Sequence, residues 1–260
     1  MKKIICTLAA SVLALSMLAG CGNTTKKIES AADLAAAKVA VQEGTTGDIL
    51  VSEDYPDATV SRFKSALDAG MDLSNGKVDA VVLDELPAKK IVEKNDKLDI
   101  LPEELTTEEY AIAIKKGNTE LVEKVNKALA DMKADGTFDE ISNAWINGDE
   151  EAQAKLAEKA EPTGSEILIM GTNASFPPFE TRDDAGNVVG FDVEMTKEIA
   201  RRLGMSFKVE DMNFDSLPVA VDSGKITMAV AGMTVTEERK ENMEFSDGYY
   251  TSTQVIITKK

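Results

Sequence analysis

The chain contains no histidine, and its only two cysteines, Cys6 and Cys21, fall within the first 21 of its 260 residues. The commonest general base and metal ligand is therefore missing, and no thiol follows Cys21. Positive charge is also scarce, since 29 lysines and arginines stand against 46 aspartates and glutamates, a formal charge of −17. Such a surface repels nucleic acid. We predict no catalytic residue, no metal, no cofactor and no nucleic-acid partner.

Long apolar runs are scarce as well, and the run at residues 4–18, after Lys2 and Lys3, is too short for a comfortable membrane span. A charged start, an apolar centre and small residues before a cut site are typical of a secretory signal, here residues 1–21. Leu-Ala-Gly-Cys at 18–21 resembles the bacterial lipobox, which implies lipid on Cys21 after cleavage. We expect an extracytoplasmic protein anchored to the outer face of the membrane, with 22–27 as a tether. The alternative is an ordinary signal peptide with a chance cysteine.

Two strand-and-turn patterns are repeated along the chain. Residues 38–47 and 166–175 are each an apolar run that ends in Gly-Thr and a small polar residue. A second strand pattern follows a Gly-Lys pair in each half, at 76–84 and 224–232. Strands that alternate with helices predict α/β lobes with largely parallel sheets. Two such lobes in series would enclose a cleft, which is a usual place for a small ligand.

The spacing of apolar residues also predicts individual elements. It favours an amphipathic helix over 60–69, a strong helix over 121–134 and a last apolar strand over 253–258. Residues 147–165 are rich in alanine, glutamate and lysine, and we interpret them as a solvated helix and a turn that form a connector. The expected lobes are a smaller one at 28–109 and a larger one at 110–260.

Several blocks resemble one known family. Phe-Pro-Pro-Phe-Glu at 176–180, Val-Gly-Phe-Asp-Val at 189–193 and the blocks at 231–240 and 245–250 are similar to the polar amino-acid binding proteins of bacterial ABC importers, family 3. Residues 39–48 and 78–84 are similar to the second lobe of that family. The resemblance implies a two-lobe periplasmic-binding-protein-like fold of type II, with the ligand between the lobes. It also implies a monomer that works with a transporter permease.

The order of these blocks departs from the family. There the lobe with Phe-Pro-Pro-Phe comes first and the Gly-Thr-Thr lobe is inserted, so this chain resembles a circular permutation. Lys260 would continue naturally into Lys27 and Ile28, and 147–165 would bridge the usual termini. Permutation is tolerated where the termini lie close together and the new break is exposed. We expect the break at one of the two crossings between the lobes, which would cut the hinge.

Two charged residues match the family's contacts to the two charges of a free amino acid. A buried zwitterion needs a partner for each charge, because an unpaired buried charge is costly. Arg239 matches the arginine that grips the carboxylate, and its planar fork suits both oxygens. Asp84 matches the acid that takes the α-ammonium. The alternatives are a surface arginine beside two glutamates and an aspartate that caps the next helix.

The remaining site residues are also implied by the resemblance. Thr234 and Gly232 match neighbouring backbone contacts, and Thr46 begins a helix whose amides would face the carboxylate, unless this turn is only an ordinary cap. Phe176 and Phe214 match the aromatic pair that encloses the ligand side chain, whereas we expect two further phenylalanines, Phe179 and Phe191, in the core. By position, Asn173 and Gln42 face the far end of that side chain. Many relatives that take basic amino acids carry aspartate at Asn173, so a neutral amide such as glutamine is favoured and arginine stays possible.

The resulting hypothesis is a lipid-anchored receptor that delivers a polar L-amino acid to an ABC importer. One alternative is an enzyme on the same fold, since some relatives are dehydratases or peptidoglycan-cleaving lyases. No acid and base pair of the required kind stands out in the sequence. Another alternative is a ligand-sensing module of a membrane receptor.

Overall fold

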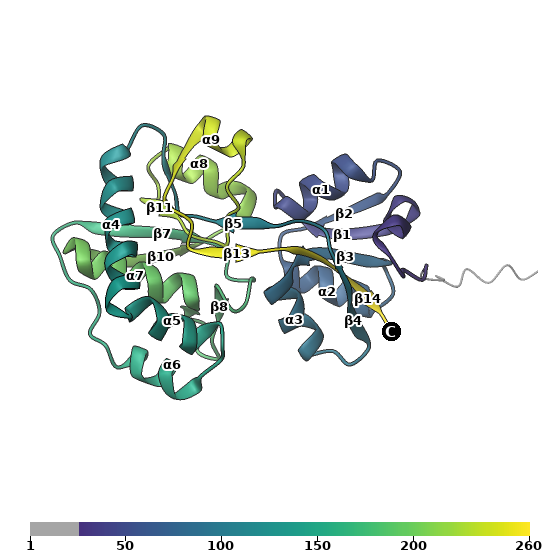
Figure 1. Ribbon diagram of the computed structural model, residues 1–260, viewed down its shortest axis with the longest axis horizontal. Coiled ribbons are helices and arrows are strands. Elements are labelled where there is room, and N and C mark those ends of the chain that lie inside the picture. The colour runs from purple at the N-terminus through teal and green to yellow at the C-terminus, as the bar shows by residue number, and fades with distance from the viewer. Residues whose placement is uncertain (1–25) are drawn as a thin grey trace, which may run out of the picture.

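The computed structural model describes residues 26–260 as two α/β lobes joined by a pair of strands (Figure 1). The predicted signal peptide, Cys21 and the first part of the predicted tether lie outside the described residues. Within residues 26–260, no helix is long and apolar enough to cross a membrane.

The smaller lobe is a five-stranded mixed sheet with helices on its faces. Its strands are β1 (Lys38–Gln42), β2 (Thr59–Phe63), β3 (Ala80–Asp84), β4 (Leu98–Glu104) and β14 (Gln254–Lys259), and its helices are η1 (Ala31–Ala36), α1 (Thr46–Asp54), α2 (Ala66–Ser74) and α3 (Glu85–Glu93). The sheet order is β2-β1-β3-β14-β4, with β1, β2 and β3 parallel and β14 antiparallel to both of its neighbours. The parallel strands β1 and β3 end at Gln42 and Asp84. These carboxyl ends share one edge of the sheet, where open α/β sheets bind ligands.

The larger lobe repeats this plan. Its sheet contains β6 (Ala113–Lys115), β7 (Ile167–Thr172), β10 (Ser206–Asp211), β11 (Met228–Ala229) and β12 (Met243–Phe245), in the order β10-β7-β11-β6-β12. Around it lie α4 (Thr119–Asp135), α5 (Thr137–Trp145), α6 (Glu150–Ala157), α7 (Phe191–Leu203), η2 (Phe214–Ser216), α8 (Leu217–Asp222), α9 (Glu237–Asn242) and the hairpin of β8 (Thr181–Arg182) and β9 (Val188–Val189). β10, β7 and β11 are parallel, and β6 is antiparallel to both of its neighbours, β11 and β12. In each of the two sheets, one strand therefore runs against the other four.

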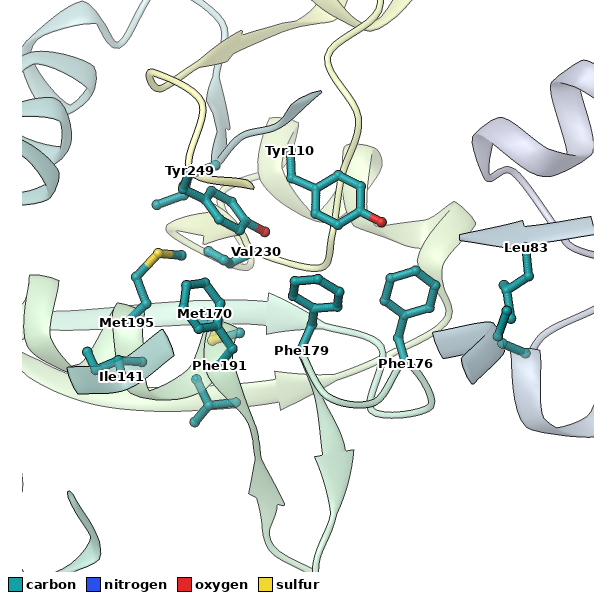
Figure 2. Close-up of a cluster of buried hydrophobic side chains, with 14 of the residues drawn as sticks. Leu83, Tyr110, Ile141, Met170, Phe176, Phe179, Phe191, Met195, Val230 and Tyr249 are labelled. Atoms are coloured by element: carbon teal, nitrogen blue, oxygen red, sulfur yellow. The ribbon is translucent and has the colours of Figure 1, made fainter. Parts of the chain in front are cut away.

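An aromatic cluster fills the larger lobe next to the smaller one (Figure 2). Phe179 and Phe191 are fully buried, as predicted for core residues, and their ring centroids lie 6.2 Å apart with the rings edge to face. Phe176 lies at the rim of this cluster, between Phe179 and Leu83 in the view of Figure 2. The core of the larger lobe therefore continues up to the cleft.

Two short strands carry the chain between the lobes. β5 (Glu108–Tyr110) and β13 (Tyr250–Ser252) pair antiparallel, with Tyr110 opposite Tyr250 (Figure 1). The chain leaves the smaller lobe after β4, builds the larger lobe and returns through β13 into β14. This paired ribbon carries both crossings between the lobes, at the place where the resemblance implies the hinge.

The expected division into lobes in series, 28–109 and 110–260, needs correction because β14 belongs to the smaller lobe. Val255 and Ile256 lie opposite Leu83 and Val82 of β3, and both are buried. This strand is apolar on both faces because helices cover both sides of the sheet. Its position between β3 and β4 makes the smaller lobe discontinuous in sequence.

The expectation that the break cuts the hinge is wrong. The backbone N–H of Lys260 donates to Lys97 O at 3.0 Å, and that of Lys26 donates to Asp79 Oδ1 at 2.7 Å. Lys97 and Asp79 precede β4 and β3, so Lys26 and Lys260 both lie at the smaller lobe (Figure 1). Both crossings between the lobes are present as continuous chain.

The helix predicted over 60–69 is also wrong. Val60 to Phe63 form strand β2, which pairs with β1 in register, with Val39 opposite Val60. The helix begins only at Ala66, where the Ser65 side chain accepts a hydrogen bond from Asp68 N. β-branched residues at an edge strand gain a parallel partner there, which outweighs the helical spacing of Phe63 and Leu67.

The predicted connector contains α6, which packs on α5. Leu156 is buried in the core of the larger lobe, while most of 147–165 is exposed. The segment therefore runs over the surface of the larger lobe and reaches β7 with two buried apolar residues, Leu156 and Pro162.

Candidate functional site

One narrow cavity between the lobes contains every ligand-contact residue predicted from the sequence. Its lining residues are Gln42, Thr45, Thr46, Asp84, Asn173, Phe176, Glu180, Phe214, Ala231, Gly232, Thr234 and Arg239. Nine of these were predicted, and Thr45, Glu180 and Ala231 were not. The smaller lobe contributes the ends of β1 and β3 and the start of α1, and the larger lobe contributes the rest.

The start of α1 forms one wall. Gly44 has φ of +78°, a left-handed conformation that favours glycine, and it turns the chain from β1 into the helix. Thr45 is the N-cap: its hydroxyl accepts from Asp48 N at 3.4 Å and donates to Gln42 O at 2.7 Å. Thr46 is the first helical residue, so its amide belongs to the turn that has no partner within the helix. Thr45 therefore caps the helix, and the amide of the adjacent Thr46 is still available to an anion.

Asp84 faces the cavity from the end of β3. It occupies the N-cap position of α3, yet its side chain makes no capping hydrogen bond. Instead its carboxylate accepts from the hydroxyl of Tyr110 and from that of Ser252, the latter at 3.3 Å. The side chain is 4% exposed, and burial together with the nearby charge of Glu108 raises its pKa to about 7. A cation beside Asp84 would stabilise its charged form.

Arg239 lies in the first turn of α9 and faces the smaller lobe, which carries Asp84. The Thr236 hydroxyl caps this helix by accepting from Arg239 N at 3.2 Å. The guanidinium donates to Thr234 O at 2.7 Å and, across the cleft, to Gly44 O at 3.0 Å. It also lies over the ring of Phe214, 5.5 Å from the centroid. Burial lowers its pKa, and both acceptors are neutral carbonyls, so an anion would be a better partner.

Gly232 and Thr234 connect the cavity to the hinge. Gly232 has φ of +55°, and a Cβ there would lie 2.7 Å from Phe176 Cε1. Its N–H donates to Asp192 Oδ2 at 3.0 Å. The Thr234 hydroxyl donates to Glu108 Oε2 at 2.5 Å, so it faces β5.

At the other end of the cavity the two lobes touch directly. Gln42 Nε2 donates to Asn173 Oδ1 at 2.9 Å, and Asn173 Nδ2 donates to Met212 O at 2.8 Å. Phe176 and Phe214, 5% and 7% exposed, form apolar walls of the same cavity. Two amides and two aromatic rings suit a ligand side chain with an apolar stem and a polar end.

Glu180 is the charged residue that the sequence reasoning missed. It is fully buried and lines the cavity, and neither carboxyl oxygen has a hydrogen-bond donor. An acid directly after the apolar block that ends at Phe179 was the available signal, since buried acids are rare without a partner. Among residues 26–260, no group of three or more acidic or sulfur ligands has metal-site geometry.

The family model for bacterial extracellular solute-binding proteins, family 3, matches residues 25–148 and 168–260. The chain is 45% identical over 98 residues to the arginine-binding extracellular protein ArtP of Bacillus subtilis (strain 168), which is 38% of each chain. It is 31% identical over 134 residues to the glutamine-binding protein GlnH of the same organism, 52% of this chain and 48% of the relative. The chain thus spans about two fifths to one half of the length of these relatives.

Solved structures give similarly partial matches. Holo ArgBP from T. maritima is 52% identical, with 32% of this chain and 37% of that chain covered and a TM-score of 0.32. An ancestral arginine-binding protein bound to glutamine is 48% identical, with the same coverages and a TM-score of 0.32. Members of the matching family are solute-binding proteins and not enzymes. With most of its length matched by the family model, the chain belongs to the bacterial extracellular solute-binding proteins of family 3.

Proposed function

We propose that this protein captures a polar L-amino acid between its lobes and delivers it to an ABC importer. The observation that carries the proposal is the placement of the half-buried Arg239 and the buried Asp84, which are oppositely charged and lie on opposite lobes of one cavity. A free amino acid has a carboxylate and an ammonium on one carbon, and it would satisfy both. Because each lobe supplies one partner, the ligand would stabilise the closed form, which a permease could recognise.

Each ligand group has a proposed contact. The carboxylate would bind the Arg239 guanidinium, the Thr46 amide and the backbone at Thr234, while the ammonium would bind Asp84 and the Gly232 carbonyl. The side chain would lie between Phe176 and Phe214 and reach Asn173 and Gln42. Arginine and glutamine are the leading candidates, in line with the relatives named for binding one or the other. We expect a monomer.

The proposal also covers anchorage and chain order. Lipid on Cys21 would hold the protein at the outer face of the cell membrane. In support of circular permutation, the family model matches two segments and leaves 149–167 between them unmatched, a range that overlaps most of the proposed connector at 147–165.

A thermal-shift screen of the domain against the twenty L-amino acids, ornithine and cystine tests the receptor function. Ligand at about a hundred times its Kd adds roughly 2.7 kcal/mol to the free energy of unfolding. A shift confined to one or two polar amino acids supports the proposal and identifies the ligand. A folded protein that shifts with none of them contradicts it.

A further inference from the structure

Glu180 is a buried acid with no structural partner for its charge. Its backbone is fixed, because Phe176 N donates to Glu180 O at 2.9 Å and Glu180 N donates to Phe176 O at 3.1 Å. This tight turn holds the carboxyl of Glu180 in the wall of the cavity, where the side chain of Phe176 also lines the wall. An unpaired ionised carboxylate in such a place would cost several kcal/mol.

A second buried acid explains how Glu180 is accommodated. Asp192 is fully buried, and its Oδ2 accepts from the Tyr249 hydroxyl at 2.9 Å and from Gly232 N at 3.0 Å. With both acids ionised, Asp192 Oδ1 and both Glu180 oxygens lack a donor. A proton on Glu180 would provide a donor for Asp192, whose Oδ1 lacks one, and the pKa values of both acids are raised by their burial. Asp192 already has two donors, so it is the member of the pair that carries the charge.

The surroundings keep this proton in place while the cavity has no ligand. Burial and the charge of Asp192 raise the pKa of Glu180 well above its usual range, and Asp211 of β10 and Asp84 of β3 act in the same direction. The one cation that lines the cavity, Arg239, donates to two carbonyls instead. Glu108 of β5 faces Asp84 and Arg239 and adds a further negative charge.

We propose that Glu180 is the counter-charge for a cationic ligand side chain, and that a guanidinium-bearing amino acid displaces the proton that Glu180 shares with Asp192. The inference rests on the proposed amino-acid receptor function. Arg239 and Asp84 neutralise the two backbone charges of the ligand, and Asn173 and Gln42 are neutral amides. Among the lining residues, only Glu180 is then left to balance a third charge. The guanidinium binds, the Glu180 O–H bond breaks, and the proton leaves to solvent, so the charge of the cavity does not change.

A comparison of arginine with citrulline isolates the release of the proton from Glu180. The two ligands have the same backbone charges and nearly the same shape, and citrulline has a neutral urea in place of the guanidinium. Titration calorimetry of the protein in buffers of different protonation enthalpy, at pH 6–8, counts the protons released. Any proton lost from Asp84 is common to both ligands, so we expect arginine to release about one proton more than citrulline. Arginine affinity relative to citrulline should rise by up to about tenfold per pH unit.

The variant Glu180→Gln keeps the size of the side chain and removes its charge. We expect it to weaken arginine binding at least tenfold, to change citrulline binding less than about threefold and to abolish the extra proton release. Glu210→Gln, a partly exposed acid of β10 outside the cavity, is the matched control. The proton count on the unmodified protein needs no variant, so it stands even if Glu180→Gln fails to fold.

The outcomes distinguish this inference from the receptor function. Equal proton release for arginine and citrulline overturns the role of Glu180, and so does a protein that binds glutamine but not arginine. In both cases amino-acid binding itself survives. If no amino acid binds to the folded protein, the receptor function fails first.

Discussion

Gln42 and Asn173 are 131 positions apart in the chain, yet Gln42 Nε2 donates a 2.9 Å hydrogen bond to Asn173 Oδ1 across the cleft. Gln42 ends β1 of the smaller lobe, and Asn173 follows β7 of the larger lobe. The pair closes the end of the cavity where a ligand side chain would terminate. A change of charge at Asn173 should therefore alter the affinity for ligands according to the charge of their side chains.

Asn173→Asp is expected to shift selectivity toward arginine. The carboxylate can still accept from Gln42 but cannot replace the hydrogen bond that Asn173 Nδ2 donates to Met212 O, so a modest loss of stability is expected. The added charge should raise the arginine-to-citrulline affinity ratio about tenfold. Titration calorimetry with both ligands measures this ratio. Asn75→Asp, on an exposed turn after α2, is the control. An unchanged ratio would mean that the ligand side chain ends elsewhere.

Arg239→Ala should cost about 2–5 kcal/mol of binding free energy, a loss of roughly 30-fold or more, because it leaves the ligand carboxylate buried without its partner. Arg239→Lys keeps the charge but not the fork, and we expect an intermediate loss. The unfolding temperature should change little, since the guanidinium contacts two backbone carbonyls and one ring. A loss under about tenfold for the alanine variant would contradict the assignment.

Asp84→Asn should weaken ligand binding to a similar extent while the far-UV spectrum stays unchanged. The amide retains the shape of the side chain and an acceptor for Tyr110, but it cannot neutralise an ammonium. Equilibrium binding of the best ligand from the screen gives the measurement. If the variant unfolds instead, Asp84 has a structural role.

The free energy of unfolding should depend on pH because the site contains buried acids with raised pKa values. The folded-state pKa of Asp84, about 7, lies above its ordinary value of 3.8. Between these values the unfolded chain is ionised while the folded protein keeps its proton, so the free energy of unfolding falls as pH rises from about 4 to 7. Asp192, with a pKa of about 6, acts in the same sense. Urea unfolding of the ligand-free protein at pH 4.5 and 7.5 should show this decrease, and Asp84→Asn should make it smaller.

Gly232→Ala tests the close approach of the cavity loop. The new Cβ would meet Phe176 Cε1 at 2.7 Å, in a backbone conformation that glycine favours. Gly148→Ala is the control, because Gly148 has φ of +75° and open space around it. In both variants alanine must adopt a left-handed backbone conformation, which costs about 1–2 kcal/mol. We expect Gly232→Ala to lose a further 1–3 kcal/mol of stability and to bind ligand more weakly, as chemical unfolding and calorimetry would show. Equal losses in the two variants would argue against a steric role for Phe176.

The sequence predicted the site better than it predicted the path of the chain. Residues such as Asp84 and Arg239 sit in short motifs whose spacing survives any rearrangement of chain order, so their convergence could be anticipated. The sequence could not predict which strands pair with the strand at 254–259. An apolar strand is compatible with the sheet of either lobe, and only packing decides between the two sheets. Val60 to Phe63 failed for a related reason: their helical spacing is overridden by pairing with β1.

Glu180 shows a different limit. An acid inside a motif looks the same whether it points to solvent or to a cavity. The role of Glu180 is inferred from its burial and from the absence of a hydrogen-bond donor to its carboxyl group. Both depend on Asp192 and on the loop at Gly232, which are not adjacent to Glu180 in the sequence.

The position of β14 has a consequence for the order of folding. β14 lies between β3 and β4, about 150 residues or more after either of them in the chain, so the central hydrogen bonds of the smaller sheet are its most non-local contacts. Until the larger lobe has been synthesised and β14 arrives, β4 has no neighbour in that sheet. The smaller lobe cannot then fold as an independent unit, and its completion waits on a slow, long-range closure. We expect calorimetry to record one cooperative unfolding transition for both lobes.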